Sequence, residues 1–194
     1  MDLFLAEDVL ENISYKSRFT QSLKTISLRQ TPLQDILDDI GIYRNEFALK
    51  LVTQDNIIGS RFKSEDSIMR KYNKTLSAGG GFKQCFNDVL GFRLHFNEYP
   101  DVFPEYFRVV DLRSGKQIDD GYRAIHLYYQ RDSHSYPIEV QLWCGEDYQF
   151  NIWSHKWIYK YMKPVVGKIL YEYYKNGNIK TEEDFVSILT SLRR

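Results

Sequence analysis

The spacing of the hydrophobic residues changes twice along the chain, and this limits the folds open to it. Toward both ends the apolar residues recur every three or four positions, which is typical of helices that bury one face. In the middle, from Gly91 to Trp143, several runs place them at every second position, as in half-buried strands. Helices, then strands, then helices predict an α+β fold in which helices flank a mixed sheet.

The expected strands cover about 56–63, 91–96, 107–112, 122–130 and 136–143. Helix starts are indicated at Ser64, at Thr181 and at Thr31, which is expected to be an N-cap with Pro32 in the first turn and Gln34 closing a capping box. Pro164 should kink or restart a helix. We also expect a helix after Gly145.

The two strands around residues 131–135 are expected to form a hairpin. Their apolar residues share one face only if Ile125 lies opposite Leu142 and Leu127 opposite Val140, with a loop from 132 to 135. This register gathers polar and aromatic residues on the other face, namely Tyr122, His126, Tyr128, Glu139 and Gln141. That face is the candidate site.

Length and composition exclude several classes of protein. A chain of 194 residues with 43% hydrophobic residues supports one sizeable core, so we expect a single domain over 1–194. Within it we expect N-terminal helices over 1–54, a core over 55–160 and C-terminal helices over 161–194. Lys+Arg and Asp+Glu are both 26, so any anion site must come from local clustering.

The cellular location follows from what the sequence lacks. No apolar run approaches the roughly 20 residues of a membrane span, and the N-terminus does not resemble a signal peptide. The two cysteines form no C-x-x-C motif, so we expect a cytoplasmic protein without disulfides.

A basic cluster follows the first expected strand. Its members are Arg61, Lys63, Arg70, Lys71 and Lys74, arranged around Ser67. A strand end beside a helix N-terminus, surrounded by cations and one hydroxyl, suits a polyphosphate. The alternative is an ordinary solvated helix face.

Two carboxylates and two aromatic rings complete the candidates. Asp88 precedes one strand and Glu139 lies within another, so together they could hold Mg²⁺ or accept a proton. Tyr122 offers a flat surface for a base, with His126 on the same face. The alternatives are a capping aspartate, a surface glutamate and a half-buried tyrosine.

These clusters follow one another in an order that resembles the synthetase domain of the RelA/SpoT family. The matching segments are Arg61-x-Lys63-x₃-Ser67-Ile68-x₂-Lys71, Asp88 to Arg93, Gly121 to Leu127, Ile138 to Leu142, and Trp153-Ser154-His155-x₃-Tyr159-Lys160. They cover roughly residues 55–160. Each segment alone is weakly specific, but five segments in this order with matching gaps are highly specific.

The resemblance implies a nucleotidyltransferase-like fold and an ATP-dependent transfer of the β,γ-pyrophosphate of ATP to a ribose 3′-hydroxyl. It implies that ATP is bound by Arg61, Lys63, Ser67, Lys71 and Arg93. Asp88 would hold Mg²⁺, and Glu139 would support the metal or take the 3′-hydroxyl proton. Tyr122 would stack on the acceptor base, with His126 and Gln141 beside it.

The short chain resembles the small, single-domain members, which divide into alarmone synthetases using GDP or GTP and toxic small alarmone synthetases. Some of the latter modify the 3′ end of tRNA, block translation and are held by a protein antitoxin. Alarmone makers usually carry an Arg where this chain has Trp143, and a Pro-Lys pair where it has residues ending in Asp119-Asp120. Losing two such charged contacts weakens binding of a free guanine nucleotide by about 3 kcal/mol.

We therefore expect the terminal adenosine of tRNA as acceptor, with (p)ppGpp synthesis from GDP or GTP as the alternative. Contacts to the tRNA backbone are expected from Arg113, Lys116 and Arg123, although a plain surface loop explains them as well. A third possibility, a catalytically dead module that only binds RNA or protein, is disfavoured because Asp88 and Glu139 are both present.

Overall fold

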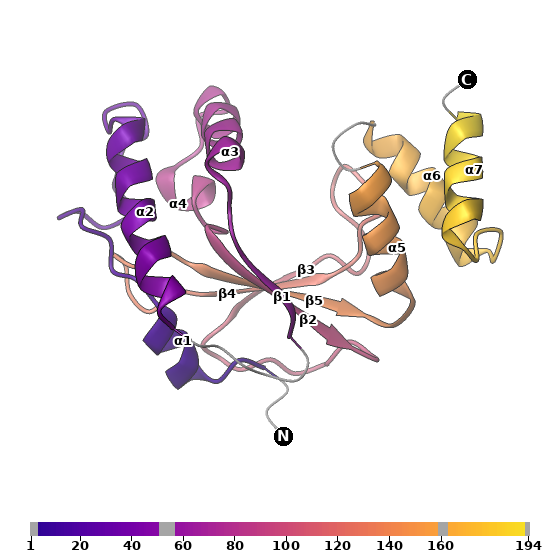
Figure 1. Ribbon diagram of the computed structural model, residues 1–194, viewed down its shortest axis with the longest axis horizontal. Coiled ribbons are helices and arrows are strands. Elements are labelled where there is room, and N and C mark those ends of the chain that lie inside the picture. Colours follow the sequence, from indigo (N-terminus) through magenta and orange to yellow (C-terminus); the bar gives the residue numbers. More distant parts are fainter. Residues whose placement is uncertain (1–3, 51–56, 159–162, 193–194) are drawn as a thin grey trace. The chain divides into compact units, whose positions relative to one another are not determined.

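The computed structural model describes residues 4–50, 57–158 and 163–192 (Figure 1). Its helices are α1 (Glu7–Ile13), α2 (Leu33–Ala48), α3 (Glu65–Ser77), α4 (Phe82–Cys85), α5 (Gly145–Trp157), α6 (Pro164–Lys175) and α7 (Glu182–Leu192). Its strands are β1 (Ile57–Phe62), β2 (Leu90–Phe96), β3 (Arg108–Asp111), β4 (Ile125–Tyr129) and β5 (Ile138–Cys144). The five strands form one mixed sheet in the order β1-β2-β5-β4-β3. The α+β expectation is confirmed.

The sheet places the two strands that carry the central motifs beside each other. β1 pairs with β2 in antiparallel fashion, so that Arg61 lies opposite Gly91. β2 and β5 are neighbours, and in β5 the side chains of Ile138, Val140 and Leu142 are fully buried. β4 and β5 are adjacent, as the hairpin expectation requires. Its residue-by-residue register stays a prediction.

The chain divides into two compact units. Unit one comprises residues 1–94, 102–109 and 127–141, and it includes helices α1 to α4 (indigo to magenta in Figure 1). Unit two comprises residues 95–101, 110–126 and 142–194. In unit two, α5, α6 and α7 (orange to yellow) bury a common core of Phe150, Leu170 and Phe185. The assignment of residues 1–194 to a single domain stays a prediction.

A buried carboxylate ties together three segments of unit one. Asp39 of α2 is 4% exposed and accepts hydrogen bonds from the hydroxyls of Tyr15 at 2.7 Å and Tyr136 at 3.0 Å. The rings of Tyr15 and Tyr43 stack at 4.9 Å. Burial is the main reason that the pKa values of Tyr15 and Tyr136 are raised. These contacts fix α2 and the start of β5 against the N-terminal segment.

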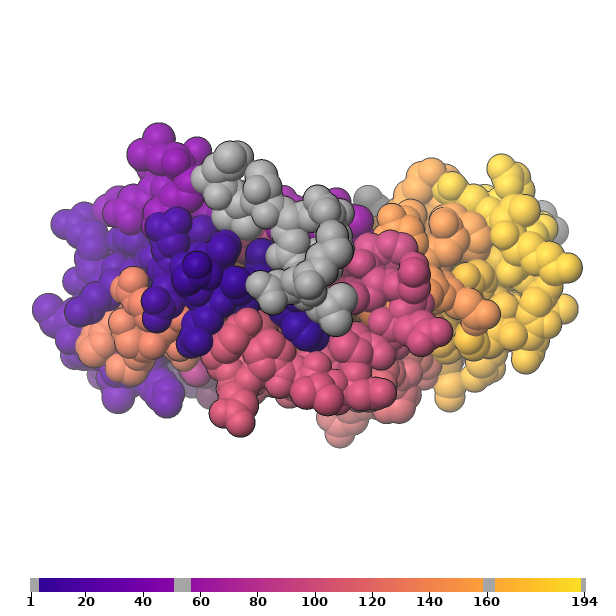
Figure 2. Space-filling view, turned by 90° about the horizontal axis from the view of Figure 1, so that it is seen from below, coloured from indigo at the N-terminus to yellow at the C-terminus, as the bar shows by residue number. Residues whose placement is uncertain are grey.

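The N-terminal segment also binds the turn between β4 and β5. The amide of Ser17 donates to the carbonyl of His134 at 2.9 Å, and the amide of Leu23 donates to that of Ser133 at 2.8 Å. Lys16 and Ser135 form an isolated β-bridge. Figure 2 shows this turn as a salmon patch against indigo N-terminal residues. The early residues therefore help to hold the turn that precedes Glu139.

Most expected helix starts are correct, and one is wrong. Pro164 begins α6, and the hydroxyl of Thr181 accepts a hydrogen bond from the amide of Asp184 at 3.2 Å. Thr31 is not the cap of α2, since Pro32 holds that position without a side-chain hydrogen bond. The amide of Gln34 donates to Asp38 at 2.8 Å instead of closing a capping box.

Two further boundaries differ from the expectation. β4 begins at Ile125, three residues later than expected, because the amides of Tyr122 and Arg123 donate to the side chains of Asp120 and Asn151. The four-residue helix α4 was not anticipated. Asn56, Tyr159 and Lys160 lie outside the described residues. No helix in the described part of the chain could cross a membrane.

Candidate functional site

The strongest charge cluster of unit one lies around Asp88. Its carboxylate pairs with the ammonium groups of Lys63 and Lys71, the second at 2.8 Å. Lys71 also donates to the side-chain carbonyl of Asn87 at 2.6 Å. Lys63 directly follows β1, Lys71 belongs to α3, and Asp88 precedes β2. The motif residues Lys63, Lys71 and Asp88 are thus brought together from three segments.

Lys63 is held in a setting that disfavours its charge. Its side chain is 12% exposed. Burial lowers its pKa, and the positive charges of Lys71 and Arg61 act in the same direction, while Asp88 opposes them. Three cations near one carboxylate leave an excess of positive charge, which favours binding of an anion.

Glu139 is the second centre of unit one, and both of its carboxylate oxygens are held. The hydroxyl of Tyr128 donates to Oε1 at 2.9 Å, and the amide of Gln141 donates to Oε2 at 2.8 Å. The guanidinium of Arg93 donates to Oε1 of Gln141 at 3.2 Å. Glu139 is 5% exposed. These two donors fix the orientation of the Glu139 carboxylate.

A small hollow connects the phosphate-binding candidates with Glu139. It is lined by residues of β1, β2 and β5, among them Arg61, Arg93, Glu139 and Gln141. Gly91 borders it, and a Cβ at that position would lie 3.7 Å from Oε2 of Glu139. Two arginines and a carboxylate therefore share one hollow.

The carboxylates of Asp88 and Glu139 both influence the pKa of the Tyr128 hydroxyl. The negative charges of Asp88 and Glu139 both contribute, after burial, to raising the pKa of the Tyr128 hydroxyl. Tyr128 is thus within electrostatic reach of both acids.

Ser67 lies in the first turn of α3 and is part of a hydroxyl and arginine cluster. It accepts a hydrogen bond from the hydroxyl of Ser64 at 2.9 Å and one from Arg70 at 3.0 Å. Ser64 occupies the N-cap position of α3 without bonding the helix amides. A helix N-terminus beside hydroxyls and cations is a favourable place for phosphate oxygens.

Unit two contains the expected stacking residue. The hydroxyl of Tyr122 lies 2.9 Å from Nε2 of His126, and it accepts a hydrogen bond from the indole of Trp143 at 3.0 Å. Both neighbouring rings meet Tyr122 edge-on. Trp143, which the sequence marked as a departure from the family pattern, thus orients Tyr122.

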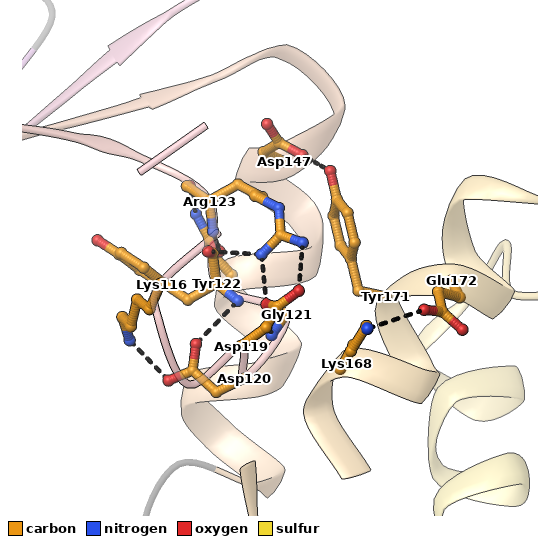
Figure 3. Close-up of polar contacts among 11 residues, drawn as sticks. Lys116, Asp119, Asp120, Gly121, Tyr122, Arg123, Asp147, Lys168, Tyr171 and Glu172 are labelled. Carbon is orange, nitrogen blue, oxygen red and sulfur yellow. Dashed lines mark hydrogen bonds and ion pairs between the residues drawn. The ribbon is translucent and has the colours of Figure 1, made fainter. Parts of the chain in front are cut away.

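Lys116 lies against the ring of Tyr122. Its ammonium is 4.6 Å from the ring centroid and 2.6 Å from a carboxylate oxygen of Asp120 (Figure 3). A cation therefore lies beside the Tyr122 ring that is expected to stack on the acceptor base, although Asp120 balances the charge of this cation. The sequence comparison, which counted a missing cation here, did not anticipate this.

Arg123 has a structural role, which corrects the expectation that it contacts RNA. Its side chain is 8% exposed, and its guanidinium binds Asp119 through two hydrogen bonds of 2.8 and 3.0 Å (Figure 3). It also stacks on Tyr171 at 4.3 Å. Arg113 is exposed and pairs with Asp111 at 2.7 Å, so it remains available at the surface.

The loop before Tyr122 lies directly on α6. A Cβ at Gly167 would fall 2.0 Å from the carbonyl oxygen of Asp120, and one at Gly121 would fall 2.3 Å from that of Gly167. Asp119 accepts a hydrogen bond from the amide of Gly121 at 2.9 Å. The absence of a side chain at Gly121 and at Gly167 therefore lets the Tyr122 loop pack closely against α6. No local sequence signal indicates this contact.

The described residues contain no group of three or more His, Cys, Asp or Glu side chains that could hold a metal by themselves. Mg²⁺ commonly uses one or two carboxylates and completes its coordination with waters and phosphate oxygens. A carboxylate has about four acceptor positions, so Asp88 retains some beyond its two lysine contacts. The residues present fit a nucleotide-borne Mg²⁺ better than a permanent metal site.

Comparison with known proteins adds fold likenesses only. No family model and no curated relative match the chain. Among solved structures, small alarmone synthetase 1 from Bacillus subtilis is similar at 20% identity and a TM-score of 0.42, over 83% of this chain and 90% of that one. A GTP pyrophosphokinase family protein from Streptococcus pneumoniae is similar at 19% identity and a TM-score of 0.43, over 83% and 88%.

Proposed function

We propose that this protein is an ATP-dependent pyrophosphotransferase that moves the β,γ-pyrophosphate of ATP to a ribose 3′-hydroxyl. The observation that carries the proposal is the joint placement of cations and carboxylates in unit one: Lys63 and Lys71 on Asp88, and Arg61 and Arg93 in the hollow with Glu139. Phosphoryl-type transfer depends on charge neutralisation and placement of the reacting oxygens more than on covalent help from the protein.

In this proposal the cations bind the donor. Lys63, Lys71, Arg61 and Arg93 bind ATP and neutralise its triphosphate, and Ser67 and the first turn of α3 bond its oxygens. Asp88 would hold the Mg²⁺ that accompanies the nucleotide, and the ion would neutralise part of the phosphate charge. The excess positive charge around Asp88 supports this assignment.

Glu139 acts on the acceptor. Its carboxylate takes the proton of the attacking 3′-hydroxyl, and Gln141 keeps that carboxylate oriented. Tyr122 stacks on the acceptor base with His126 beside it. Apart from Tyr122, the proposed acceptor residues come from two strands. His126 and Tyr128 belong to β4, and Glu139 and Gln141 belong to β5.

The acceptor we propose is the 3′-terminal adenosine of tRNA, which makes the protein a translation-blocking toxin controlled by a protein antitoxin in the cytoplasm. Support comes from Trp143, which bonds the Tyr122 hydroxyl where alarmone makers carry a phosphate-binding arginine. Such an acceptor has no free 5′ polyphosphate and needs no cation there.

A second candidate, (p)ppGpp synthesis from GDP or GTP, is favoured by one observation. Lys116 lies beside Tyr122 and offers a cation near the acceptor base. Its pairing with Asp120 reduces that charge, so we place this candidate second.

The test incubates purified protein with Mg²⁺ and γ-labelled ATP, and offers deacylated tRNA, GDP and GTP in turn. We expect label in tRNA and none with Glu139→Gln. Label only in a guanosine polyphosphate would move the second candidate to first place. Binding of tRNA without any transfer would indicate a binding module instead.

A further inference from the structure

A cavity of about 680 Å³ lies in unit one beside the Glu139 centre. Its walls come from α4, from the start of β3 and from the β4–β5 turn region, and they include Lys83, Asn87, Tyr106, Arg108, Tyr128 and Gln130. Ligand cavities in proteins commonly measure about 300–1,000 Å³, so the space suits an organic ligand. The donor and acceptor roles proposed above leave it unused.

The cavity wall carries two cations, Lys83 and Arg108. Burial lowers the pKa of Lys83, and the charges of Lys24 and Arg108 lower it further, with no carboxylate acting against them. Glu105 also borders the cavity. In the described part of the chain, no ion pair joins Lys24, Lys83 or Arg108 to an acid. Two lining cations against one acid leave a net positive charge, which favours an anionic ligand.

The remaining walls suit bases. Tyr106 and Tyr128 present aromatic surface, and Asn87 and Gln130 present carboxamides that can both donate and accept hydrogen bonds. Cations, rings and amides in one cavity are the groups that bind single-stranded nucleic acid.

Two residues that line the cavity, Tyr128 and Asn87, also contact the candidate site around Glu139 and Asp88. Tyr128 lines the cavity with its ring, over which the guanidinium of Arg108 lies at 4.4 Å, and its hydroxyl bonds Glu139. Asn87 lines it as well and accepts a hydrogen bond from Lys71. A ligand in the cavity therefore touches residues that orient Glu139 and Lys71.

We propose that this cavity binds the nucleotides that precede the acceptor 3′ end of a single-stranded RNA terminus, with Lys83 and Arg108 on the phosphodiesters and Tyr106 against a base. The inference rests on the proposed function, because it extends the acceptor from the ribose at Glu139 into the adjoining cavity. The competing occupant is the 5′ polyphosphate of a free GDP or GTP, and the test below separates the two ligands.

The test measures binding of a fluorescent trinucleotide, CpCpA, without ATP, to the wild type, to Lys83→Gln and to Lys83→Gln/Arg108→Gln. We expect at least tenfold weaker binding in the double variant, because it loses both charge-assisted contacts to the phosphodiesters. The slope of log K against log salt should fall by about 1.4, or 0.7 for each phosphate. Lys163→Gln/Lys180→Gln, which removes the same charge from exposed positions, is the control and should bind as the wild type does.

Lys83→Gln alone leaves the Arg108–Tyr128 contact intact, so a loss of affinity in it cannot come from a displaced Glu139. With ATP present, the turnover of wild type should rise from adenosine to CpA to CpCpA, and the double variant should lose this dependence while adenosine turnover persists. Equal CpCpA affinity in all forms overturns the inference, as does a loss of GDP affinity in place of CpCpA affinity. CpCpA binding that depends on Lys83 without any transfer retains the cavity assignment and rejects the proposed reaction.

Discussion

Replacing Gly167 by Ala tests whether the close approach of α6 sets the position of the Tyr122 loop. The new Cβ would lie 2.0 Å from the carbonyl oxygen of Asp120, where ordinary contact begins at 3.4 Å, so the loop must move by about 1.4 Å, the difference of the two. The obstacle is backbone and cannot rotate away. Gly41, inside α2, provides the matched control, because a Cβ there meets nothing within 4 Å.

The expected loss of stability is taken as the difference between the two alanine variants, because the gain in helix propensity is common to both and cancels. Ala gains up to about 1 kcal/mol over Gly in a helix interior at either position. Overpacking costs about 1–3 kcal/mol at Gly167 only. We therefore expect Gly167→Ala to be less stable than Gly41→Ala by about 1–3 kcal/mol, or about 2–12 °C in Tm for a chain of this size.

Thermal unfolding and isothermal titration check the two consequences separately. Gly167→Ala should raise the KM for the acceptor, because Tyr122 follows the displaced loop, while the Kd for ATP stays that of the wild type. Equal Tm values for the two alanine variants, together with an unchanged acceptor KM, would refute the reasoning.

Three further predictions use other contacts of the described residues. Tyr128→Phe removes a hydrogen bond from Glu139, so kcat should fall about tenfold or more, with the ATP Kd unchanged; equal kcat would remove Tyr128 as a positioning residue. The hydrogen bonds from Arg123 lower the pKa of Asp119, so its stabilisation is present at neutral pH and lost as the pH falls below the usual Asp range near about 4. Asp119→Asn should therefore be less stable at pH 7 and lose less on acidification, which chemical denaturation at several pH values measures; identical pH profiles would contradict this. Asp39→Ala leaves two tyrosine hydroxyls without their acceptor and should cost about 2–4 kcal/mol in urea unfolding, whereas a loss below about 0.5 kcal/mol would argue against the cluster's role.

The sequence predicts the elements well wherever local rules decide them. Alternation located β2 and β5, and the signals at Pro164 and Thr181 located α6 and α7, because strand period and helix capping are properties of neighbouring residues. The capping box at Thr31 was wrong because Gln34 found a partner in Asp38, four residues along its own helix.

The candidate site was predicted in its residue types and only partly in its contacts. The sequence grouped Lys63 and Lys71 around Ser67 and paired Asp88 with Glu139, whereas the structure pairs Asp88 with both lysines. Arg123 was misassigned because its partner Asp119 and the ring of Tyr171 approach it through the fold. The position of Lys116 over Tyr122 depends on the turn at Gly121, which residue spacing does not reveal.

The central claim is that two phosphoryl groups move together from ATP, and the most direct measurement follows the label. Samples of ATP labelled at the α, β or γ position are each turned over with Mg²⁺ and tRNA, and the product is separated from AMP. The account predicts β and γ label in the acceptor, α label only in AMP, and no transfer by Asp88→Asn. Transfer of γ label alone, or of α label, would contradict it.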